Sequence, residues 1–291
     1  MDTAGAPARR RSPDRPGPRR NRDADWNAWP VADYLAENYR RLHPCDIGVI
    51  RHHAAVYRSY APGSLSRTLE LGAGPNLYPL MLAGAACRRV DALEPSAASV
   101  RYLRRQLAAG PDDSWQPFYA LCRSLDPALP ESVTEALGRV RVVRGTAEDL
   151  AEGTYALASM NFVAESITED FDEFSALCAV FVRAVRPGGR LVASFMERMP
   201  SYRIGTGPLW PACPVDGAAL RAVFAPRTTD LRIERLAKDR TLPEYGDTGV
   251  LLLSAVRPEQ AGPDEVGPQQ VGPDQAGPDE AGPDQAGPDQ G

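Results

Sequence analysis

Two glycines follow a short apolar run that ends in an acid: Glu70 precedes Gly72 and Gly74, and apolar residues at helical spacing come next. This order predicts a buried strand, a tight turn and then a helix. Glycine has no Cβ, so the backbone of such a turn can approach a bound molecule closely. A second apolar run ends at Glu94, 20 residues after Gly74. A carboxylate at that position can accept hydrogen bonds from both ribose hydroxyls, so the pattern predicts a nucleoside site.

The turn lacks the marks of two other nucleotide-binding loops. A dinucleotide fingerprint needs a third glycine three residues after Gly74, and Leu77 stands there instead. No Gly-Lys-Ser or Gly-Lys-Thr follows, which argues against a triphosphate-binding loop. An NAD-dependent oxidoreductase is therefore a disfavoured alternative for this chain.

The chain around the turn predicts alternating helices and strands. Two helical segments, about residues 31–42 and 45–60, precede the first strand, and residues 111–138 form a partly helical insertion. Apolar stripes at helical spacing follow the second and fourth strands. Strands are predicted at about residues 67–71, 90–93, 140–143, 155–160, 191–195, 231–236 and 250–256.

This alternation predicts an α/β fold, in which a mostly parallel sheet carries helices on both faces. Such sheets bind ligands beyond the carboxyl ends of their strands. We therefore expect the chemistry on the turns that follow Leu71, Glu94, Val143 and Met160.

The two ends of the chain differ in composition from its middle. Residues 1–25 hold seven arginines and four aspartates without an apolar run, which predicts a disordered head and no export signal. Residues 258–291 repeat Gly-Pro every five residues and hold eight acids and no basic residue, which predicts a disordered tail. Residues 26–257 have the length of a single α/β domain.

The charges and cysteines narrow the class of protein. Residues 26–257 hold 26 basic and 26 acidic residues, and this neutral balance argues against nucleic acid as an obligate partner. No apolar stretch reaches membrane-spanning length. The five cysteines are widely spaced and form no Cys-x-x-Cys, so we expect reduced thiols in a cytoplasmic protein. The sequence shows no metal-ligand spacing, and we predict no metal.

The glycine turn and its two acids resemble motifs I and II of the class I S-adenosylmethionine (SAM) methyltransferases. The step Arg186-Pro187-Gly188-Gly189 into the fifth strand is similar to another hallmark of these enzymes. The resemblance implies a Rossmann-like class I methyltransferase fold, with a mostly parallel seven-stranded sheet and an N-terminal helical lid. It also implies SAM as the cofactor.

The chain further resembles the family of nicotinamide, phenylethanolamine and indolethylamine N-methyltransferases. Residues 161–168 also resemble a narrower actinobacterial subgroup of methyltransferases. The resemblance covers residues 26–257 and implies a small-molecule methyl acceptor. The segments that carry it are residues 33–39, residues 72–78, an insertion that opens at Trp115, and residues 201–205.

The resemblance also implies which residues bind SAM. It places Tyr34, Tyr39 and Tyr78 around the methionine moiety, where Asn38 replaces a further tyrosine of the family. Phenol hydroxyls can donate to the carboxylate of SAM, and aromatic faces suit its sulfonium. The predicted cofactor-binding residues are Tyr34, Tyr39, Glu70, Gly72, Ala73, Gly74, Tyr78, Glu94, Ser99, Thr146 and Ala147.

Thr146 departs from the family's pattern in the turn after the third strand. The family has an acid there that reads the adenine amino group, and the Thr146 hydroxyl is a weaker acceptor than a carboxylate. Glu148 or Asp149 could substitute, and the sequence leaves both open.

Glu165 is the predicted acid of the substrate site. It follows the fourth strand, on the rim where a methyl acceptor should lie, and could orient an amine or take up its proton. Phe162 and Tyr202 are predicted to wall the acceptor pocket. Methyl transfer from a sulfonium mainly needs alignment and exclusion of water, so the lack of an obvious base is compatible with it.

The sequence therefore predicts a SAM-dependent methyltransferase that acts on N or O of a small molecule. The N-terminal helices would close over SAM as a lid. Besides the oxidoreductase, two alternatives stay open: a methyltransferase for RNA or protein, and a SAM-binding protein without catalytic activity.

Overall fold

The computed structural model describes residues 17–259 of the 291-residue chain. Residues 1–16, which are most of the predicted head, and the predicted tail from residue 260 onward lie outside the described residues. The eight α-helices and seven strands of the described residues lie between residues 31 and 256, and a short 3-10 helix, Asn21–Asp23, precedes them.

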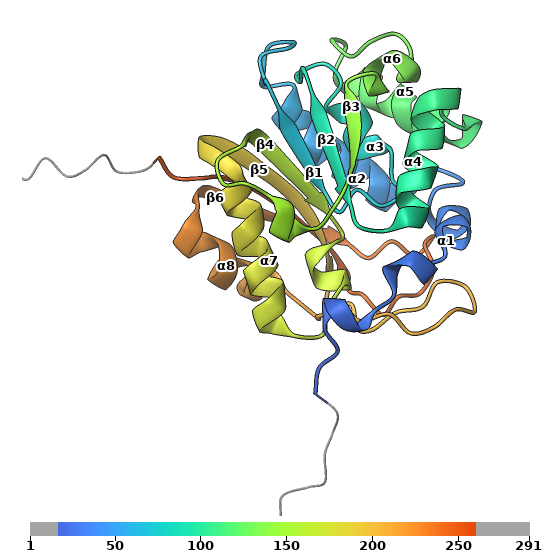
Figure 1. The fold of residues 1–291 in the computed structure, drawn as a ribbon, viewed down its shortest axis with the longest axis vertical. Helices are drawn as coiled ribbons and strands as arrows, with labels where there is room; N and C mark the ends of the chain where they lie inside the picture. The colour runs from blue at the N-terminus through green and yellow to red at the C-terminus, as the bar shows by residue number, and fades with distance from the viewer. Residues whose placement is uncertain (1–16, 260–291) are drawn as a thin grey trace, which may run out of the picture. The chain divides into compact units, whose positions relative to one another are not determined.

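Seven strands form one sheet in the order β3-β2-β1-β4-β5-β7-β6 (Figure 1). The first five strands run parallel, and β7 runs antiparallel to both β5 and β6. The predicted mostly parallel, seven-stranded sheet is confirmed. Its strands are β1 (Thr68–Leu71), β2 (Val90–Glu94), β3 (Val140–Arg144), β4 (Tyr155–Asn161), β5 (Val185–Glu197), β6 (Thr229–Ala237) and β7 (Gly249–Val256).

β1 and β4 lie at the centre of the sheet, and every residue of both strands is buried. Central parallel strands are covered on both faces, which explains why they read as nearly continuous apolar runs. Parallel pairing sets Leu71 level with Leu93 on one side and Met160 on the other. The turns that follow these strands therefore gather at one end of the sheet.

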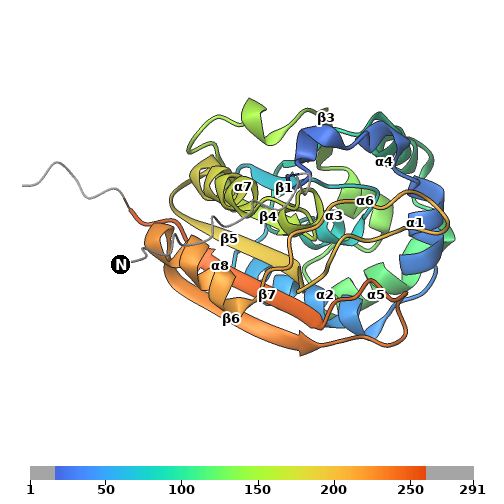
Figure 2. The same ribbon diagram turned by 90° about the horizontal axis from the view of Figure 1, so that it is seen from below.

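Helices cover both faces of the sheet, as predicted. One buried core packs α2, α3, α5 and α6 on one face, and a second core packs α7 and α8 on the other (Figure 1). Figure 2 shows β6 at the edge of the sheet opposite β3. The helices are α1 (Val31–Asn38), α2 (Pro44–Tyr57), α3 (Tyr78–Leu82), α4 (Ala97–Ala109), α5 (Gln116–Leu125), α6 (Val133–Leu137), α7 (Phe171–Ala184) and α8 (Gly217–Phe224).

α2 belongs to the core, although the sequence analysis assigned it to a lid. Val49 and Ile50 are fully buried, and the helix packs against α3, α5, β5 and β7. Burial of such a face stabilises the fold and fixes the helix in place. Only the first turn of α2 reaches the end of the sheet where the strand turns gather, through Cys45 and Asp46.

Residues 17–25 contact the domain, although their composition predicts disorder. Arg19 donates from Nε to Oε1 of Glu169 at 2.9 Å. The backbone N–H of Asn21 donates to Oε2 of Glu173 at 3.0 Å. Both acids lie at the start of α7, far from this segment in the sequence. Amino-acid composition alone therefore does not reveal these partners.

The Pro-Gly-Gly step that was predicted as a turn lies inside β5. Gly188 has a φ of +71° and donates its N–H to the carbonyl of Arg257 at 2.9 Å. Regular pairing with β4 resumes at Arg190. The glycine therefore makes an irregular stretch within the strand and does not mark its start.

All five cysteines are buried and free, as expected for reduced core thiols. Among residues 17–259, no helix combines the length and apolar character needed to cross a membrane.

Candidate functional site

A cavity of about 240 Å³ opens at the carboxyl end of the sheet. Four strand turns line it, and these are the four that the sequence analysis predicted. They contribute residues 72–76 after β1, residues 94–96 after β2, residues 145–147 after β3 and residues 161–163 after β4.

The glycines of the first turn have separate roles. Gly72 and Gly74 have φ values of +67° and +54°, which L side chains rarely adopt. A Cβ on Gly72 would lie 2.7 Å from both methyl groups of Val163, so Gly72 is needed for packing. A Cβ on Gly74 would meet no protein atom closer than the Gly72 carbonyl oxygen at 4.0 Å, so Gly74 leaves space in the cavity free.

Glu94 joins the first turn to the second. Its Oε2 accepts the backbone N–H of Gly74 at 2.9 Å, and its Oε1 accepts that of Ser96 at 2.8 Å. Burial raises the pKa of Glu94, and the two N–H groups oppose this shift. A carboxylate can accept about four hydrogen bonds, so capacity remains for a ligand in the cavity. Ser99, in the first turn of α4, also lines the cavity.

Thr146 and Ala147 line the cavity as predicted, but neither candidate acid beside them does. Asp149 turns back within its own loop, where its Oδ2 accepts the N–H of Thr146 at 2.7 Å. Glu148 is exposed outside the cavity. No carboxylate of this turn therefore faces the cavity.

Of the three tyrosines predicted around a methionine moiety, Tyr34 lines the cavity, whereas Tyr39 and Tyr78 do not. The hydroxyl of Tyr39 lies 3.1 Å from that of Tyr34 and accepts from Nδ2 of Asn76 at 3.2 Å. Its ring stacks on Trp115 in the core. Tyr39 ends α1, and this position turns it inward, so it supports the cavity wall from behind.

Glu70 does not line the cavity, contrary to the prediction. It is buried in a polar network in which its Oε1 accepts from Nδ2 of Asn161 at 3.1 Å and its Oε2 accepts from the hydroxyl of Ser159. Ser194 donates in turn to Oδ1 of Asn161 at 2.5 Å. Burial raises the pKa of Glu70 to about 7. Asn161 reaches the cavity, so Glu70 acts on the site through this amide.

Glu165 is also absent from the cavity wall, where the sequence analysis placed a substrate-site acid. It is fully buried, and its Oε1 accepts the N–H of Met196 at 2.8 Å. Its Oε2 has no hydrogen-bond partner among the described residues. The short 3-10 helix Ala164–Ser166 turns this side chain toward the core.

Phe162 and Tyr202 line the cavity as predicted. Phe162 has a φ of +58°, a strained conformation for a residue other than glycine, and such strain is frequent at functional sites. Tyr202 donates its hydroxyl proton to the carbonyl of Ser166 at 3.3 Å. Burial raises the pKa of Tyr202, so its hydroxyl stays protonated near neutral pH.

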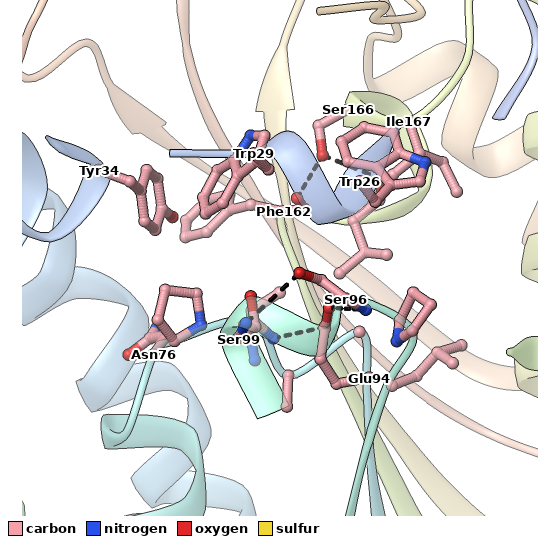
Figure 3. A pocket seen from close by; sticks show the side chains of 18 of the residues that line it. Trp26, Trp29, Tyr34, Asn76, Glu94, Ser96, Ser99, Phe162, Ser166 and Ile167 are labelled. Carbon is pink, nitrogen blue, oxygen red and sulfur yellow. Dashed lines mark hydrogen bonds between the residues drawn. The ribbon is translucent and has the colours of Figure 1, made fainter. Parts of the chain in front are cut away.

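Residues 17–30, which we name the N-terminal strap, provide the opposite side of the cavity. Trp29 of the strap lies beside Tyr34, and both Trp26 and Trp29 face Glu94 across the cavity (Figure 3). Trp26 also stacks on Trp210, with ring centroids 5.2 Å apart.

Several lining residues were missed by the sequence analysis. Two tryptophans in an otherwise polar segment were a usable signal, since such a segment has no other reason to hold large apolar side chains. The sequence held no such signal for the other missed residues, because they come from elements far apart in the sequence. The missed residues include Trp26, Trp29, Asp46, Met196, Met199, Ile204, Leu242 and Tyr245.

The charge of the lining is limited to acids: Asp46 and Glu94 line the cavity, and no Arg or Lys of the described residues does. Within residues 17–259, no group of three or more His, Cys, Asp or Glu side chains is arranged to hold a metal ion.

We predict that Glu165 lowers stability at alkaline pH. Burial raises its pKa from 4.5 to about 8, so the protonated side chain is favoured in the folded state. The stability that it contributes is fully present below about pH 4.5. That stability is lost as the pH rises to about 8, at up to ~1.4 kcal/mol per pH unit. Glu165→Gln should therefore show a smaller fall in Tm between about pH 5 and about pH 8 than the unaltered protein.

The same scans on Glu148→Gln, an exposed acid, control for the loss of one charge. An unchanged pH dependence in Glu165→Gln would contradict the burial argument.

No protein-family model matches the chain, and no curated protein matches it. Among solved structures, the N-methyltransferase NodS from Bradyrhizobium japonicum WM9, in complex with S-adenosyl-L-homocysteine, is 15% identical, with a TM-score of 0.51 over 81% of this chain and 100% of that one. The [4+2]-cyclase SpnF is 15% identical, with a TM-score of 0.52 over 80% of this chain and 94% of that one. Together with the strand order, these similarities show that the chain has the Rossmann-like fold of the class I SAM-dependent methyltransferases.

Proposed function

We propose that the protein is a SAM-dependent methyltransferase that transfers a methyl group to N or O of a small-molecule acceptor. The observation that supports this most is the Glu94 carboxylate, which two backbone N–H groups hold beside the open turn at Gly74. This is the arrangement that a ribose next to a glycine turn requires.

The described residues fit SAM. The space at Gly74 is one that a side chain would fill, and Glu94 retains acceptor capacity for a ribose. Thr146 and Ala147 offer a hydroxyl and backbone groups to an adenine, in place of the family's acid. Tyr34 presents an aromatic ring to the cavity, which suits a sulfonium.

SAM supplies a methyl group that is already activated for in-line displacement. The protein then has to align the acceptor and exclude water. The wall on the acceptor side is largely apolar and is formed by Phe162, Met199 and Tyr202. The strap tryptophans cover the cavity. The Tyr202 hydroxyl is itself engaged, since it donates to the carbonyl of Ser166 at 3.3 Å.

The lining favours a small acceptor over a macromolecule. Nucleic acids and acidic peptides need arginine or lysine at the site, and the described residues place neither in the cavity. The narrower likeness to the nicotinamide, phenylethanolamine and indolethylamine N-methyltransferases rests on the motif residues and belongs to this proposal.

A second candidate is a protein that binds SAM without methylating anything. The lack of a cavity-facing carboxylate in the Thr146 turn favours it, and so does the [4+2]-cyclase SpnF, which has a similar fold. Transfer of a labelled methyl group separates the two candidates.

The test has two stages. Calorimetry should first show that the protein binds SAM and that NADH does not compete. Tritiated SAM and fractionated extract of the source organism should then give a labelled small molecule. Binding of SAM without transfer to any fraction would favour the second candidate, and preferential binding of NADH would refute both.

We predict that Gly74→Val abolishes SAM binding while the protein stays folded. The valine side chain would occupy cavity space that is free of protein atoms, so the Kd for SAM should rise by roughly a hundredfold or more. Calorimetry measures the Kd, and circular dichroism confirms the fold.

Gly63→Val is the matched control. Gly63 shares the left-handed conformation, with a φ of +68°, and has open space around its Cβ position, but it does not line the cavity. Both variants carry the same backbone strain, about 1–2 kcal/mol, so only the cavity distinguishes them. Equal loss of SAM binding in both would show that strain alone is responsible.

We predict that Arg19→Ala accelerates release of SAM severalfold. Arg19 fastens the strap by donating to Glu169 and, at 2.7 Å, to the carbonyl of Leu209. Removal of these bonds should let the strap open more often. Stopped-flow fluorescence of the strap tryptophans measures the rate.

Arg22→Ala provides the comparison within the same segment, because the Arg22 side chain is 78% exposed and lies 3.9 Å from its nearest acid. If both variants release SAM at the rate of the unaltered protein, the strap does not limit exchange.

A further inference from the structure

We propose that Asp46 binds the α-ammonium group of SAM, a role that the strand-one acid Glu70 does not fill. This inference rests on the proposed function. Within the described residues, two carboxylates line the cavity: Glu94, and Asp46 in the first turn of α2.

Asp46 is an almost fully buried carboxylate with free acceptor capacity. The residue is 5% exposed, and its Oδ2 accepts the backbone N–H of His43 at 3.1 Å. No side chain or backbone group of residues 17–259 donates a hydrogen bond to its Oδ1. Because Asp46 lines the cavity, this oxygen is available to a ligand there.

The carboxylate also lacks a counter-ion. No Arg, Lys or His of the described residues forms an ion pair with Asp46 within 4.0 Å. Burial raises its pKa to about 7, and the nearby charge of Asp239 adds to the shift. Buried acids are rarely left unpaired, because an uncompensated charge in a protein interior is strongly unfavourable. A cationic ligand group would complete the pair.

The position of Asp46 matches the amino-acid end of SAM. Asp46 and Tyr34 line the same cavity, and the Tyr34 hydroxyl lies 3.1 Å from that of Tyr39. Tyr39 accepts from Asn76 of the glycine turn. A ribose at Glu94 would leave Asp46, in the same cavity, to hold the amino-acid end of SAM.

Glu70 cannot take the same role directly. Both of its oxygens accept from side chains of β4, and the residue does not line the cavity. Asp46 can therefore pair with the ammonium group, whereas Glu70 is not available to it.

The test compares two ligands that differ at the amino-acid end. S-Adenosylhomocysteine carries the ammonium group, and 5′-methylthioadenosine is the same thionucleoside without it. Asp46→Asn keeps the shape of the side chain and the bond from His43 but removes the charge. The Kd for S-adenosylhomocysteine should rise about tenfold or more, as for a lost charged hydrogen bond, whereas the Kd for 5′-methylthioadenosine should change less than about twofold.

Asp239→Asn is the matched control, since Asp239 accepts the N–H of Cys45 at 2.8 Å beside the same helix start and does not line the cavity. It should raise neither Kd value, because loss of the Asp239 charge favours the ionised form of Asp46. Equal weakening of both ligands by Asp46→Asn, or an unchanged Kd for S-adenosylhomocysteine, would overturn the inference. If the unaltered protein binds neither ligand, the proposed function fails and this inference fails with it.

Discussion

The bond between the Gly74 N–H and the Glu94 carboxylate is the interaction on which the site depends. It ties the turn after β1 to the turn after β2 and fixes the distance between them. The parallel pairing of β1 and β2 brings the two residues to the same end of the sheet. A side chain at Gly74 would strain the backbone of the turn and also fill cavity space, so one glycine serves both the backbone and the ligand space.

The sheet and the location of the cavity could be predicted from the sequence, because both follow from periodicity and from the position of strand ends. The direction of individual side chains could not. Glu70 lies one residue before the end of β1, and the alternation of a strand turns it toward a face of the sheet. Glu165 lies only four residues beyond β4, but its short helix rotates it into the core.

Long-range partners limited the sequence analysis in a second way. Part of the strap was assigned to a disordered head, because the composition of a segment shows its own charges but not the acids that it pairs with in the fold. Its acids lie about 150 residues away, at the start of α7. Asp46 was missed for a related reason, since its helix was treated as a lid. Only packing of α2 against the sheet brings its first turn to the cavity, next to Tyr34.

The two edge strands of the sheet have a consequence for solubility. Each exposes a row of backbone groups that could pair with a strand of another molecule. β3 carries two exposed charged residues, Arg141 and Arg144. The exposed charged residues of β6 include Arg232, Glu234 and Arg235. Charged side chains along a strand edge discourage such pairing, so both edges of the described sheet are protected against pairing with another molecule.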